Sequence, residues 1–424
     1  MKIYKVGGCV RDRLLGKQPH DIDYVVVDST PELMIEQGFI QVGNSFPVFL
    51  HPETKDEYAL AHVETSTGDG YKDFNFNFSS TITLEEDLRR RDFTINALAL
   101  DEEDNIIDYF HGQKDLVNKE IKHIDDIHFQ EDPLRVLRAC RFSAQLEFTI
   151  APTTIMLCRK MVRLGMLNTL PKERIWNEIE KALHTTNFHL FLKNLELCNA
   201  LPVVLPEIAE LADVEEPIEY HPEGTTLKHV YLTLQQVKRC KVDNNNNIAL
   251  INFGLLVHDL GKILTPVEER PKHHNHDTNG IQLVEHMCER LKVPNKYREF
   301  GKLCCKYHMK FYNYLDMKTN KQYYFVRDIT KFKSDIILHL LQQVHACDFL
   351  GRDKIRTHEE CARVKMIYDK QNLIYSIMNN VTLQELPTNV QEQLKQFSGE
   401  KFGTLYEEAK LHYCKQKLSD LTKS

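Results

Sequence analysis

The sequence lacks an uninterrupted apolar run of the eighteen or so residues that a membrane span needs. Its first six residues lead directly into a Gly-Gly turn, without the basic and apolar regions of a secretory signal peptide. Both absences predict a protein that works in the cytoplasm and has no membrane partner.

The sequence also lacks the cysteine pattern of a disulfide-stabilised protein. Its eleven cysteines are odd in number, show no regular spacing and form no C-x-x-C pair. We therefore expect reduced thiols, as in cytoplasmic proteins. Five cysteines lie among apolar residues and are expected to be small core side chains, namely Cys140, Cys158, Cys198, Cys288 and Cys347.

Internal repeats and an excess of positive charge are absent too. The net charge of −7 weakly disfavours a protein that covers nucleic acid with its whole surface. The 54 Lys and Arg residues nevertheless leave room for a local basic cleft. A length of 424 residues suggests two to four domains, and 42% hydrophobic residues is an ordinary value for a globular chain.

The pattern of apolar residues changes along the chain. Residues 1–110 alternate short β-rich runs with helical segments and turns, which predicts a mixed α/β domain. From about Asp132 onward, apolar residues recur at spacings of three and four and predict helices for most of the remaining length. The polar stretch 213–224 is the best candidate linker, and a histidine-rich helical region follows it.

Two motifs near the N-terminus favour a site for phosphate and metal. In Gly7-Gly8-Cys9-Val10-Arg11-Asp12 the glycines allow close approach of a ligand, and Arg11 can clamp phosphate oxygens. A simple tight turn explains these residues equally well. Asp21 and Asp23 flank Ile22 at the start of an apolar strand, so their carboxylates converge and suit Mg²⁺. Together the motifs resemble the palm of polymerase β-type nucleotidyltransferases.

Three consecutive arginines precede the apolar segment Asp92-Phe93-Thr94-Ile95-Asn96-Ala97-Leu98. A charge run is usually a solvated face, but next to a triphosphate site it can supply a phosphate clamp, and Arg91 is the preferred candidate. We expect Asp92 to cap a following helix or to orient Arg91. Asn96 either holds the loop or contacts sugar hydroxyls.

The segment Glu131-Asp132-Pro133-Leu134-Arg135-Val136-Leu137-Arg138-Ala139-Cys140-Arg141-Phe142 starts a helix on which polar residues recur every third position. An amphipathic helix with an i,i+3 ion pair is one explanation. The functional one is a base-reading pair, in which Asp132 accepts from an exocyclic amino group and Arg135 donates to the adjacent ring nitrogen. Cytosine and adenine fit this pair, whereas uracil and guanine reverse both contacts. Two mismatches at about 1–3 kcal/mol each give roughly hundredfold discrimination.

These motifs, in this order and spacing, resemble those of class II tRNA nucleotidyltransferases. Glu173-Arg174-Ile175-Trp176-Asn177-Glu178 is similar to the family's neck motif, and residues 42–50 are similar to a family strand. The resemblance implies that Asp21 and Asp23 bind Mg²⁺ and that Asp132 with Arg135 reads the base. It also implies a set of residues that hold the triphosphate and ribose, namely Gly8, Arg11, Arg91, Arg138 and Arg141.

The chain departs from the family pattern at two places. The family's Asp-Pro-x-x-Gly turn reads Asp108-Tyr109-Phe110-His111-Gly112, without the proline. The flexible segment around this turn helps the family to switch from C to A. In addition, His62 stands where the family often has arginine.

In the histidine-rich region, His258-Asp259 follows an apolar helix, while His229 and Asp348 lie on separate predicted helices. A degenerate structural domain is the alternative to a metal site here. Histidine and carboxylate ligands from separate helices suit Mn²⁺, Co²⁺ or Ni²⁺. The order H…HD…D resembles the HD phosphohydrolases, which implies that His229, His258, Asp259 and Asp348 are ligands. His273, His274, His276 and His308 fall between them.

Together these features predict an α+β chain with a polymerase β-like nucleotidyltransferase head containing a mixed sheet, then an all-helical neck, an HD domain and a helical tail. The expected boundaries are 1–140, 141–212, 225–350 and 351–424. The predicted activity is addition of the 3′-terminal CCA to tRNA from CTP and ATP by a monomer or homodimer. HD-domain phosphatase, 2′-nucleotidase or 2′,3′-cyclic phosphodiesterase activity is also predicted. A poly(A) polymerase and a tRNA-binding phosphohydrolase with an inactive polymerase site are the alternatives.

Overall fold

The structure is a computed structural model that describes residues 1–19, 21–42, 48–66, 74–78, 80–242, 244–331 and 336–421. The middle of the family-like strand at 42–50 therefore lies outside the described residues. The chain divides into two compact units. The N-terminal unit contains Met1–Ala209 and Arg290–Lys292, and the C-terminal unit contains Glu210–Glu289 and Val293–Ser424.

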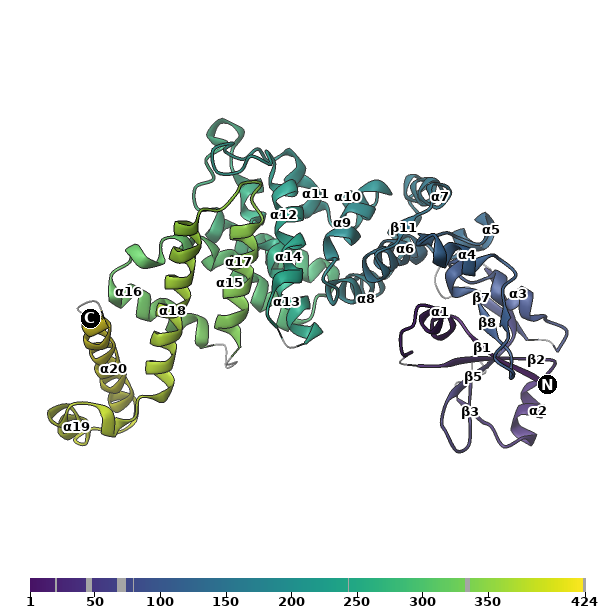
Figure 1. The fold of residues 1–424 in the computed structure, drawn as a ribbon, viewed down its shortest axis with the longest axis horizontal. Coiled ribbons are helices and arrows are strands. Elements are labelled where there is room, and N and C mark those ends of the chain that lie inside the picture. Colours follow the sequence, from purple (N-terminus) through teal and green to yellow (C-terminus); the bar gives the residue numbers. More distant parts are fainter. Residues whose placement is uncertain are drawn as a thin grey trace. The chain divides into compact units, whose positions relative to one another are not determined.

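The N-terminal unit is built on a seven-stranded sheet with the order β3-β4-β5-β2-β1-β8-β9 (Figure 1). Strand β2 is parallel to β5, and the other pairs are antiparallel, so the sheet is mixed as predicted. The strand bounds are β1 Lys2–Val6, β2 Asp23–Val27, β3 Ile40–Val42, β4 Val48–Leu50, β5 Glu57–Leu60, β8 Ala99–Leu100 and β9 Ile106–Ile107. A separate hairpin joins β6 His62–Ser66 to β7 Phe74–Phe78, and β10 Glu120–Ile121 pairs with β11 Thr149–Ile150.

The register of β1 and β2 positions the first candidate site. The two strands are antiparallel, and Val6 at the end of β1 pairs with Asp23 at the start of β2. Val6 and the residues Val25, Val26 and Val27 are buried and fix the sheet to its core. Because of this pairing, the Gly-Gly turn after β1 lies beside the carboxylates that open β2.

Helices cover the sheet and continue beyond it. Their bounds are α1 Gly8–Leu14, α2 Pro31–Glu36, α3 Leu84–Arg89, α4 Gly112–Val117, α5 Asp126–Glu131, α6 Leu134–Leu146, α7 Pro152–Arg163, α8 Lys172–Leu183, α9 Phe188–Leu197, α10 Leu201–Val204 and α11 Pro206–Ala209. Helix α6 packs against both α8 and α9. A single short 3₁₀ turn, η1 (Thr94–Asn96), follows the arginine run, so the expected helix after Asp92 was wrong.

The C-terminal unit is helical throughout its described residues. Its α-helices are α12 Thr226–Gln235, α13 Asn245–Val257, α14 His276–Leu291, α15 Asn295–Tyr312, α16 Thr319–Thr330, α17 Ile337–Leu350, α18 His358–Asn380, α19 Thr388–Leu394 and α20 Gly399–Leu421. Helix α13 contacts α12, α15 and α17. The stretch Asn245–Leu264 is long and apolar enough to cross a membrane, but it is 78% buried and has the character of a core helix. The five cysteines expected in the core are all buried.

Candidate functional site

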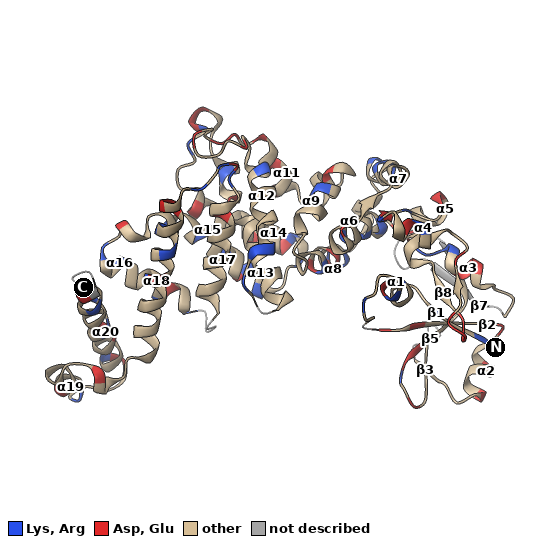
Figure 2. Ribbon diagram, in the orientation of Figure 1, with Lys and Arg blue, Asp and Glu red and all other residues tan. Residues whose placement is uncertain are grey.

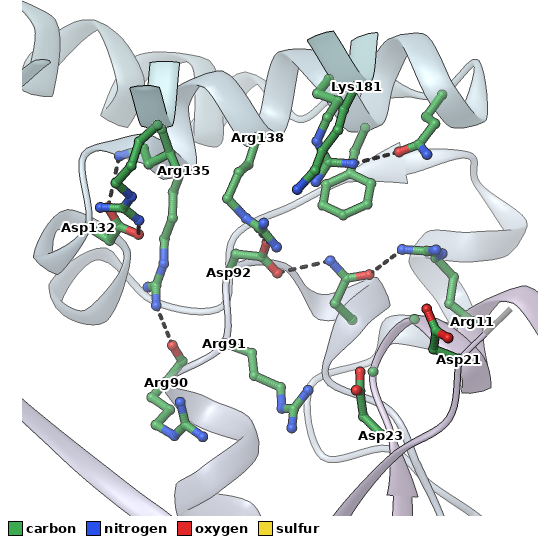
Figure 3. A pocket seen from close by; sticks show the side chains of 18 residues that line it. Arg11, Asp21, Asp23, Arg90, Arg91, Asp92, Asp132, Arg135, Arg138 and Lys181 are labelled. Atoms are coloured by element: carbon green, nitrogen blue, oxygen red, sulfur yellow. Dashed lines mark hydrogen bonds and ion pairs between the residues drawn. The ribbon is translucent and has the colours of Figure 1, made fainter. Parts of the chain in front are cut away.

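A cavity of about 690 Å³ opens between the sheet edge, the arginine run and helices α6 and α8 (Figure 3). Eight of its lining residues are cationic, and four are aspartates. The cations are Arg11, Arg90, Arg91, Arg135, Arg138, Arg141, Arg174 and Lys181. Basic residues also continue along α6, α7 and α8 in this unit (Figure 2). Such a cavity favours a highly charged anionic ligand with room for a divalent cation.

Asp21 and Asp23 lie next to one another at one end of this cavity, and both are exposed (Figure 3). Gly7 has a φ of +79°, and a Cβ there would come within 2.9 Å of Arg91 Nη1 and 3.9 Å of Asp23 Oδ2. Glycine is therefore required at this position, because a side chain would occupy the space between the arginine and the carboxylate. The predicted residues Gly8, Arg11 and Arg91 line the same cavity.

Asp87 on α3, which the sequence reasoning did not single out, is fully buried beneath the arginine run. Its Oδ1 lies 2.8 Å from an Arg90 nitrogen, and its Oδ2 lies 3.3 Å from Arg91 Nη2. Burial on its own raises the pKa of Asp87, but the two guanidinium groups hold that pKa below its usual value. Buried His62 packs against the same group, with Arg90 Nε donating to its carbonyl. His62 thus stands beside the clamp and lines a smaller neighbouring cavity with Asp23, Arg90 and Arg91.

Asp92 holds together two other arginines of the cavity. Its Oδ2 accepts from Arg138 at 2.8 Å, and its Oδ1 accepts from Asn96 Nδ2 at 2.9 Å. Asn96 in turn accepts from Arg11 Nη1 at 2.7 Å (Figure 3). Burial favours the protonated form of Asp92, yet Arg138 and Asn96 keep its pKa below the usual value. The two expected roles of Asp92 were therefore wrong, because it neither caps a helix nor contacts Arg91.

Glu178 on α8 anchors α6 to the neck. Its Oε2 lies 2.5 Å from Arg141 Nε, and both side chains are almost completely buried. Its Oε1 lies 3.9 Å from Arg138 Nη1. Burial lowers the pKa of Arg141, and the nearby carboxylate opposes that effect. Since one carboxylate faces two arginines of the cavity wall, α8 fixes the positions from which they reach a ligand.

The predicted base-reading residues lie at the far end of the cavity from Asp21 and Asp23 (Figure 3). Asp132 pairs with Arg174 of α8 at 3.0 Å. Arg135 donates to the carbonyls of His128 and Arg90, the latter at 2.6 Å. The structure thus brings both residues to the cavity, but each has a protein partner. Arg174 belongs to the neck motif, and no local sequence signal indicates that it pairs with Asp132.

The turn that lacks the family's proline keeps a defined geometry. Asp108 accepts hydrogen bonds from the backbone amides of Gly112 at 2.8 Å and Gln113 at 3.0 Å, which begin α4. A Cβ at Gly112 would collide with the Thr94 carbonyl. Asp108 and Gly112 therefore hold this turn against η1 although the proline of the family is missing.

The C-terminal unit contains a second candidate site, a cavity of about 370 Å³. Six buried residues from α12, α13, α14, α15 and α17 supply potential metal ligands around it. His229, His258 and Asp348 form one group of converging donors, and Asp259, His276 and His308 form another. The structure therefore brings together all four predicted ligands and adds His276 and His308.

Asp259 stands between the two groups. Its Oδ2 lies 3.2 Å from His258 Nε2 and 4.0 Å from His229 Nε2. Its Oδ1 lies 3.2 Å from His308 Nε2 and 3.4 Å from His276 Nε2. The two oxygens of this carboxylate thus face different histidines, and such a set of nitrogen and oxygen donors would suit a transition metal.

Each of the four histidines is oriented through its Nδ1 atom. His258, His276 and His308 donate from Nδ1 to the carbonyls of Leu255, His273 and Cys305, at distances of 2.7–2.8 Å. His229 Nδ1 lies 2.8 Å from the Glu223 carboxylate. These bonds direct every Nε2 toward the shared space, as metal-binding histidines require. Among the described residues, the polar neighbour of buried His258 Nε2 is the Asp259 carboxylate, at 3.2 Å.

The stretch 213–224, predicted to be a linker, also contributes buried residues to this site. Glu216 and Glu223 are 4% and 8% exposed. Glu216 Oε1 lies 2.7 Å from Lys262 Nζ, which is also 2.9 Å from Asp259 Oδ2. Burial lowers the pKa of Lys262, but Asp259 and Glu216 raise it above its usual value overall. The polar composition of this stretch reflects ion pairing inside the domain.

Two glycines bring the backbones of this site into direct contact. A Cβ at Gly261, two residues after Asp259, would collide with the carbonyl of His276. A Cβ at Gly280 would come within 2.8 Å of the Gly261 nitrogen. The loop that carries Asp259 and the helix that carries His276 therefore meet without side chains between them.

Three family models match successive parts of the chain. The family model for the poly A polymerase head domain matches residues 3–122, and the HD domain matches residues 226–348. Between them, residues 147–211 match the model described as probable RNA and SrmB-binding site of polymerase A. The class is thus a nucleotidyltransferase head joined through an RNA-binding neck to an HD domain.

Individual relatives narrow this class. The chain is 41% identical over 394 residues to the multifunctional CCA protein of Acinetobacter baumannii, which covers 92% of this chain and 93% of that protein. It is 43% identical over 342 residues to the multifunctional CCA protein of Legionella pneumophila, covering 80% and 82%. The chain belongs to the family of multifunctional CCA proteins, and the family predicted from the motifs is confirmed.

Solved structures agree on the fold. The Bacillus stearothermophilus CCA-adding enzyme in complex with CTP aligns with a TM-score of 0.60 and 21% identity, covering 99% of this chain and 94% of that one. A tRNA-processing enzyme complex aligns with a TM-score of 0.56 and 25% identity, covering 97% of each chain. The predicted fold class is confirmed by these neighbours and by the mixed sheet.

Proposed function

We propose that this protein adds and repairs the 3′-terminal CCA of tRNA in the cytoplasm, using CTP and ATP and releasing pyrophosphate. The observation that carries the proposal is the 690 Å³ cavity, which joins eight cationic side chains to exposed Asp21 and Asp23 at one end and Asp132 at the other. The cationic side chains suit a triphosphate, Asp21 and Asp23 suit a divalent cation, and Asp132 suits a base. The family of the chain supplies the substrate class.

The reaction joins the 3′-hydroxyl of tRNA to the α-phosphate of the incoming nucleotide. Asp21 and Asp23 are oxygen donors whose exposure suits Mg²⁺, an ion that keeps water and phosphate ligands. When bound there, Mg²⁺ lowers the barrier by neutralising charge on the reacting phosphate. Arg11, Arg91 and Arg138 hold the phosphates and ribose in line, so that attack is effectively intramolecular. The bond between the α-phosphorus and the β-phosphate oxygen breaks, pyrophosphate leaves, and the proton of the attacking hydroxyl passes to solvent.

Base selection in this proposal uses Asp132 and Arg135. The Asp132 carboxylate accepts from the amino group of cytosine or adenine, and the Arg135 guanidinium donates to the neighbouring ring nitrogen. Both groups now have protein partners, in Arg174 and in two backbone carbonyls. A matching base takes the place of these partners and satisfies both Asp132 and Arg135, whereas uracil or guanine presents the reverse pattern and satisfies neither.

We propose a second activity for the C-terminal unit, hydrolysis of phosphate esters that include 2′-nucleotides and 2′,3′-cyclic phosphates. Two donor groups share Asp259, and six buried His and Asp side chains fit ions such as Ni²⁺, Co²⁺ or Mn²⁺. When bound, such ions supply a hydroxide nucleophile at neutral pH. His229, His258, Asp259 and Asp348 are the ligands, with His276 and His308 completing the second position.

The polymerase activity is tested with the full chain, Mg²⁺ and a tRNA that lacks its last three nucleotides. CTP alone should add two cytidines, and CTP with ATP should add one adenosine after them, while UTP and GTP are excluded. A long A tail from ATP alone would identify a poly(A) polymerase instead. Absence of any incorporation would favour the tRNA-binding phosphohydrolase with an inactive head.

The hydrolase activity is tested on chain stripped of metal and then reloaded with Ni²⁺, Co²⁺ or Mn²⁺. Metal content per chain, release of phosphate from 2′-AMP and opening of 2′,3′-cyclic AMP to the monophosphate are measured together. Two ions per chain and metal-dependent hydrolysis are expected. A chain that binds no transition metal at neutral pH would mark the region as a structural domain.

A further inference from the structure

Arg352 follows α17 by two residues and lines the 370 Å³ cavity that contains the candidate metal ligands. It is only partly exposed, and its guanidinium lies over the Tyr312 ring, 4.7 Å from the centroid. The Tyr312 hydroxyl donates to Asp348 Oδ2 at 2.9 Å. Arg352 therefore lies over the face of a ring whose hydroxyl group binds a candidate ligand.

The guanidinium of Arg352 has no hydrogen bond or ion pair within the part of the chain that the structure describes, apart from this contact with Tyr312. Its Nε is buried and without a hydrogen-bond partner. The other buried cation of the cavity is already used, because Lys262 pairs with both Glu216 and Asp259. Lys272, the remaining lysine of the lining, is exposed. Of the lysine and arginine side chains that line this cavity, Arg352 is thus the partly buried one whose donors can bind a ligand.

The backbone around Arg352 is held firmly. A Cβ at Gly351 would come within 2.5 Å of the Thr233 Cα on α12, so the loop lies directly on that helix. On the other side, the Asp353 amide donates to Glu223 Oε2 at 3.2 Å, and Glu223 also orients His229. The loop and the candidate ligand His229 are therefore fixed by the same carboxylate, which sets Arg352 in register with the ligands.

The carboxylates near Arg352 do not neutralise it by direct contact. Asp348 is occupied by His229 at 3.0 Å and by Tyr312. Glu223 is occupied by His221 and His229. Arg352 is partly exposed, but its Nε is buried without an acceptor, and a buried polar group is costly unless a ligand supplies one. Its planar fork matches two oxygens of a phosphate.

We propose that Arg352 is the phosphate-binding residue of this second site and grips the non-bridging oxygens of a phosphate ester or of the released orthophosphate. The proposal rests on the proposed hydrolase function, but it assigns an anion subsite that the metal ligands do not supply. Arg352 binds two oxygens of the anion from one side, while the donor groups of Asp259 face it from the other. With a monoester, water attacks the phosphorus, the ester P–O bond breaks, the alcohol leaves with a proton, and orthophosphate stays bound to the same fork until it leaves.

Orthophosphate binding to the Ni²⁺-loaded full chain, measured by calorimetry, tests this subsite. Arg352→Ala should weaken binding by about tenfold or more, since a charge-assisted fork is lost. Arg352→Lys keeps the charge without the fork and should fall between. The control is Arg363→Ala, which removes an exposed arginine of α18 whose partner is Asp316. The KM for 2′-AMP should rise in parallel, with Ni²⁺ per chain and CCA addition unchanged.

Two outcomes would overturn the assignment. Orthophosphate affinity equal to wild type in Arg352→Ala would show that the fork holds no phosphate. Loss of Ni²⁺ from this variant would show that Arg352 supports the metal ligands instead. If the wild-type chain hydrolyses no ester yet binds orthophosphate through Arg352, the hydrolase proposal fails and the anion subsite stands.

Discussion

The two cavities use charge in opposite ways. In the first, Asp21 and Asp23 are exposed, and arginines are lined up along an open wall. In the second, six His and Asp side chains are buried, and each histidine is oriented through Nδ1. An exposed carboxylate pair suits an ion that arrives with its nucleotide and leaves with pyrophosphate. A buried, oriented donor set suits an ion that stays through many turnovers.

The two units fix the side chains of their cavities in different ways. In the first cavity, three carboxylates outside the row of arginines hold these arginines in place, namely Asp87, Asp92 and Glu178. The remaining donors of the arginines face the cavity. In the second cavity, the candidate ligands are themselves buried, and Glu223 orients one of them, His229. Loss of a supporting carboxylate should therefore affect stability in the first unit, whereas loss of a ligand should affect metal content in the second.

The largest effect is expected for the double variant Asp21→Ala, Asp23→Ala. Nucleotide addition should fall by roughly 10³-fold or more, because the charge-neutralising ion loses its donors. Single-turnover incorporation of CTP measures this loss, and Glu36→Ala on exposed α2 is the control. Transition-metal content and ester hydrolysis should not change. A parallel loss of hydrolysis would mean that the two cavities do not act independently.

Next comes His258→Ala in the second cavity. One donor of the first group is lost, and Ni²⁺ affinity should fall by roughly 100-fold, with hydrolysis falling alongside it. Metal per chain after dialysis against a weak chelator gives the measurement. His286→Ala, an exposed histidine on α14, serves as the matched control. Retention of Ni²⁺ in His258→Ala would exclude this residue from the ligand set.

Glu178→Ala should reduce stability by about 3–5 kcal/mol, because Arg141 is left as an uncompensated buried charge. Trp176, the single tryptophan of the chain, lies on the same helix and reports unfolding of this unit by fluorescence. Urea titration compares the variant with Asn177→Ala, an exposed change on α8. A difference below about 1 kcal/mol would place this pair among weak surface ion pairs.

The smallest effect is expected for Asp132→Asn. An amide can donate as well as accept, so the preference for CTP over UTP should fall by about tenfold while overall addition is less affected. The ratio of kcat/KM for CTP and UTP on tRNA ending in the discriminator base measures the change. An unaltered ratio would remove Asp132 from base reading and leave its pairing with Arg174 as a structural contact.

Local patterns in the sequence predicted much of this arrangement. The mixed sheet expected within residues 1–110 is present, and α6, α8 and α9 are among the helices expected after Asp132. These elements were predictable because their apolar spacing is local. The residues of the two candidate sites were named from motifs that the fold then gathered around two cavities.

The supporting residues could not be predicted in this way. Asn96 reaches Arg11 across 85 positions and Glu178 reaches Arg141 across 37, so no short window contains both partners. The 213–224 stretch resembled a linker because its polar residues had no visible partner nearby. Lys262, the partner of Glu216, is 46 positions away. Sequence patterns predict side-chain chemistry, whereas long-range pairing requires the fold.

The contact between Gly261 and Gly280 has a consequence for anyone who would transplant this metal site. Copying six His and Asp residues onto another helical bundle would reproduce the donors but not their spacing. Here the separation of Asp259 and His276 is set by two backbones that touch where neither residue has a side chain. One added methyl group at either position would move a loop and a helix apart. The geometry of the site therefore depends on two glycines that have no side-chain ligand atoms.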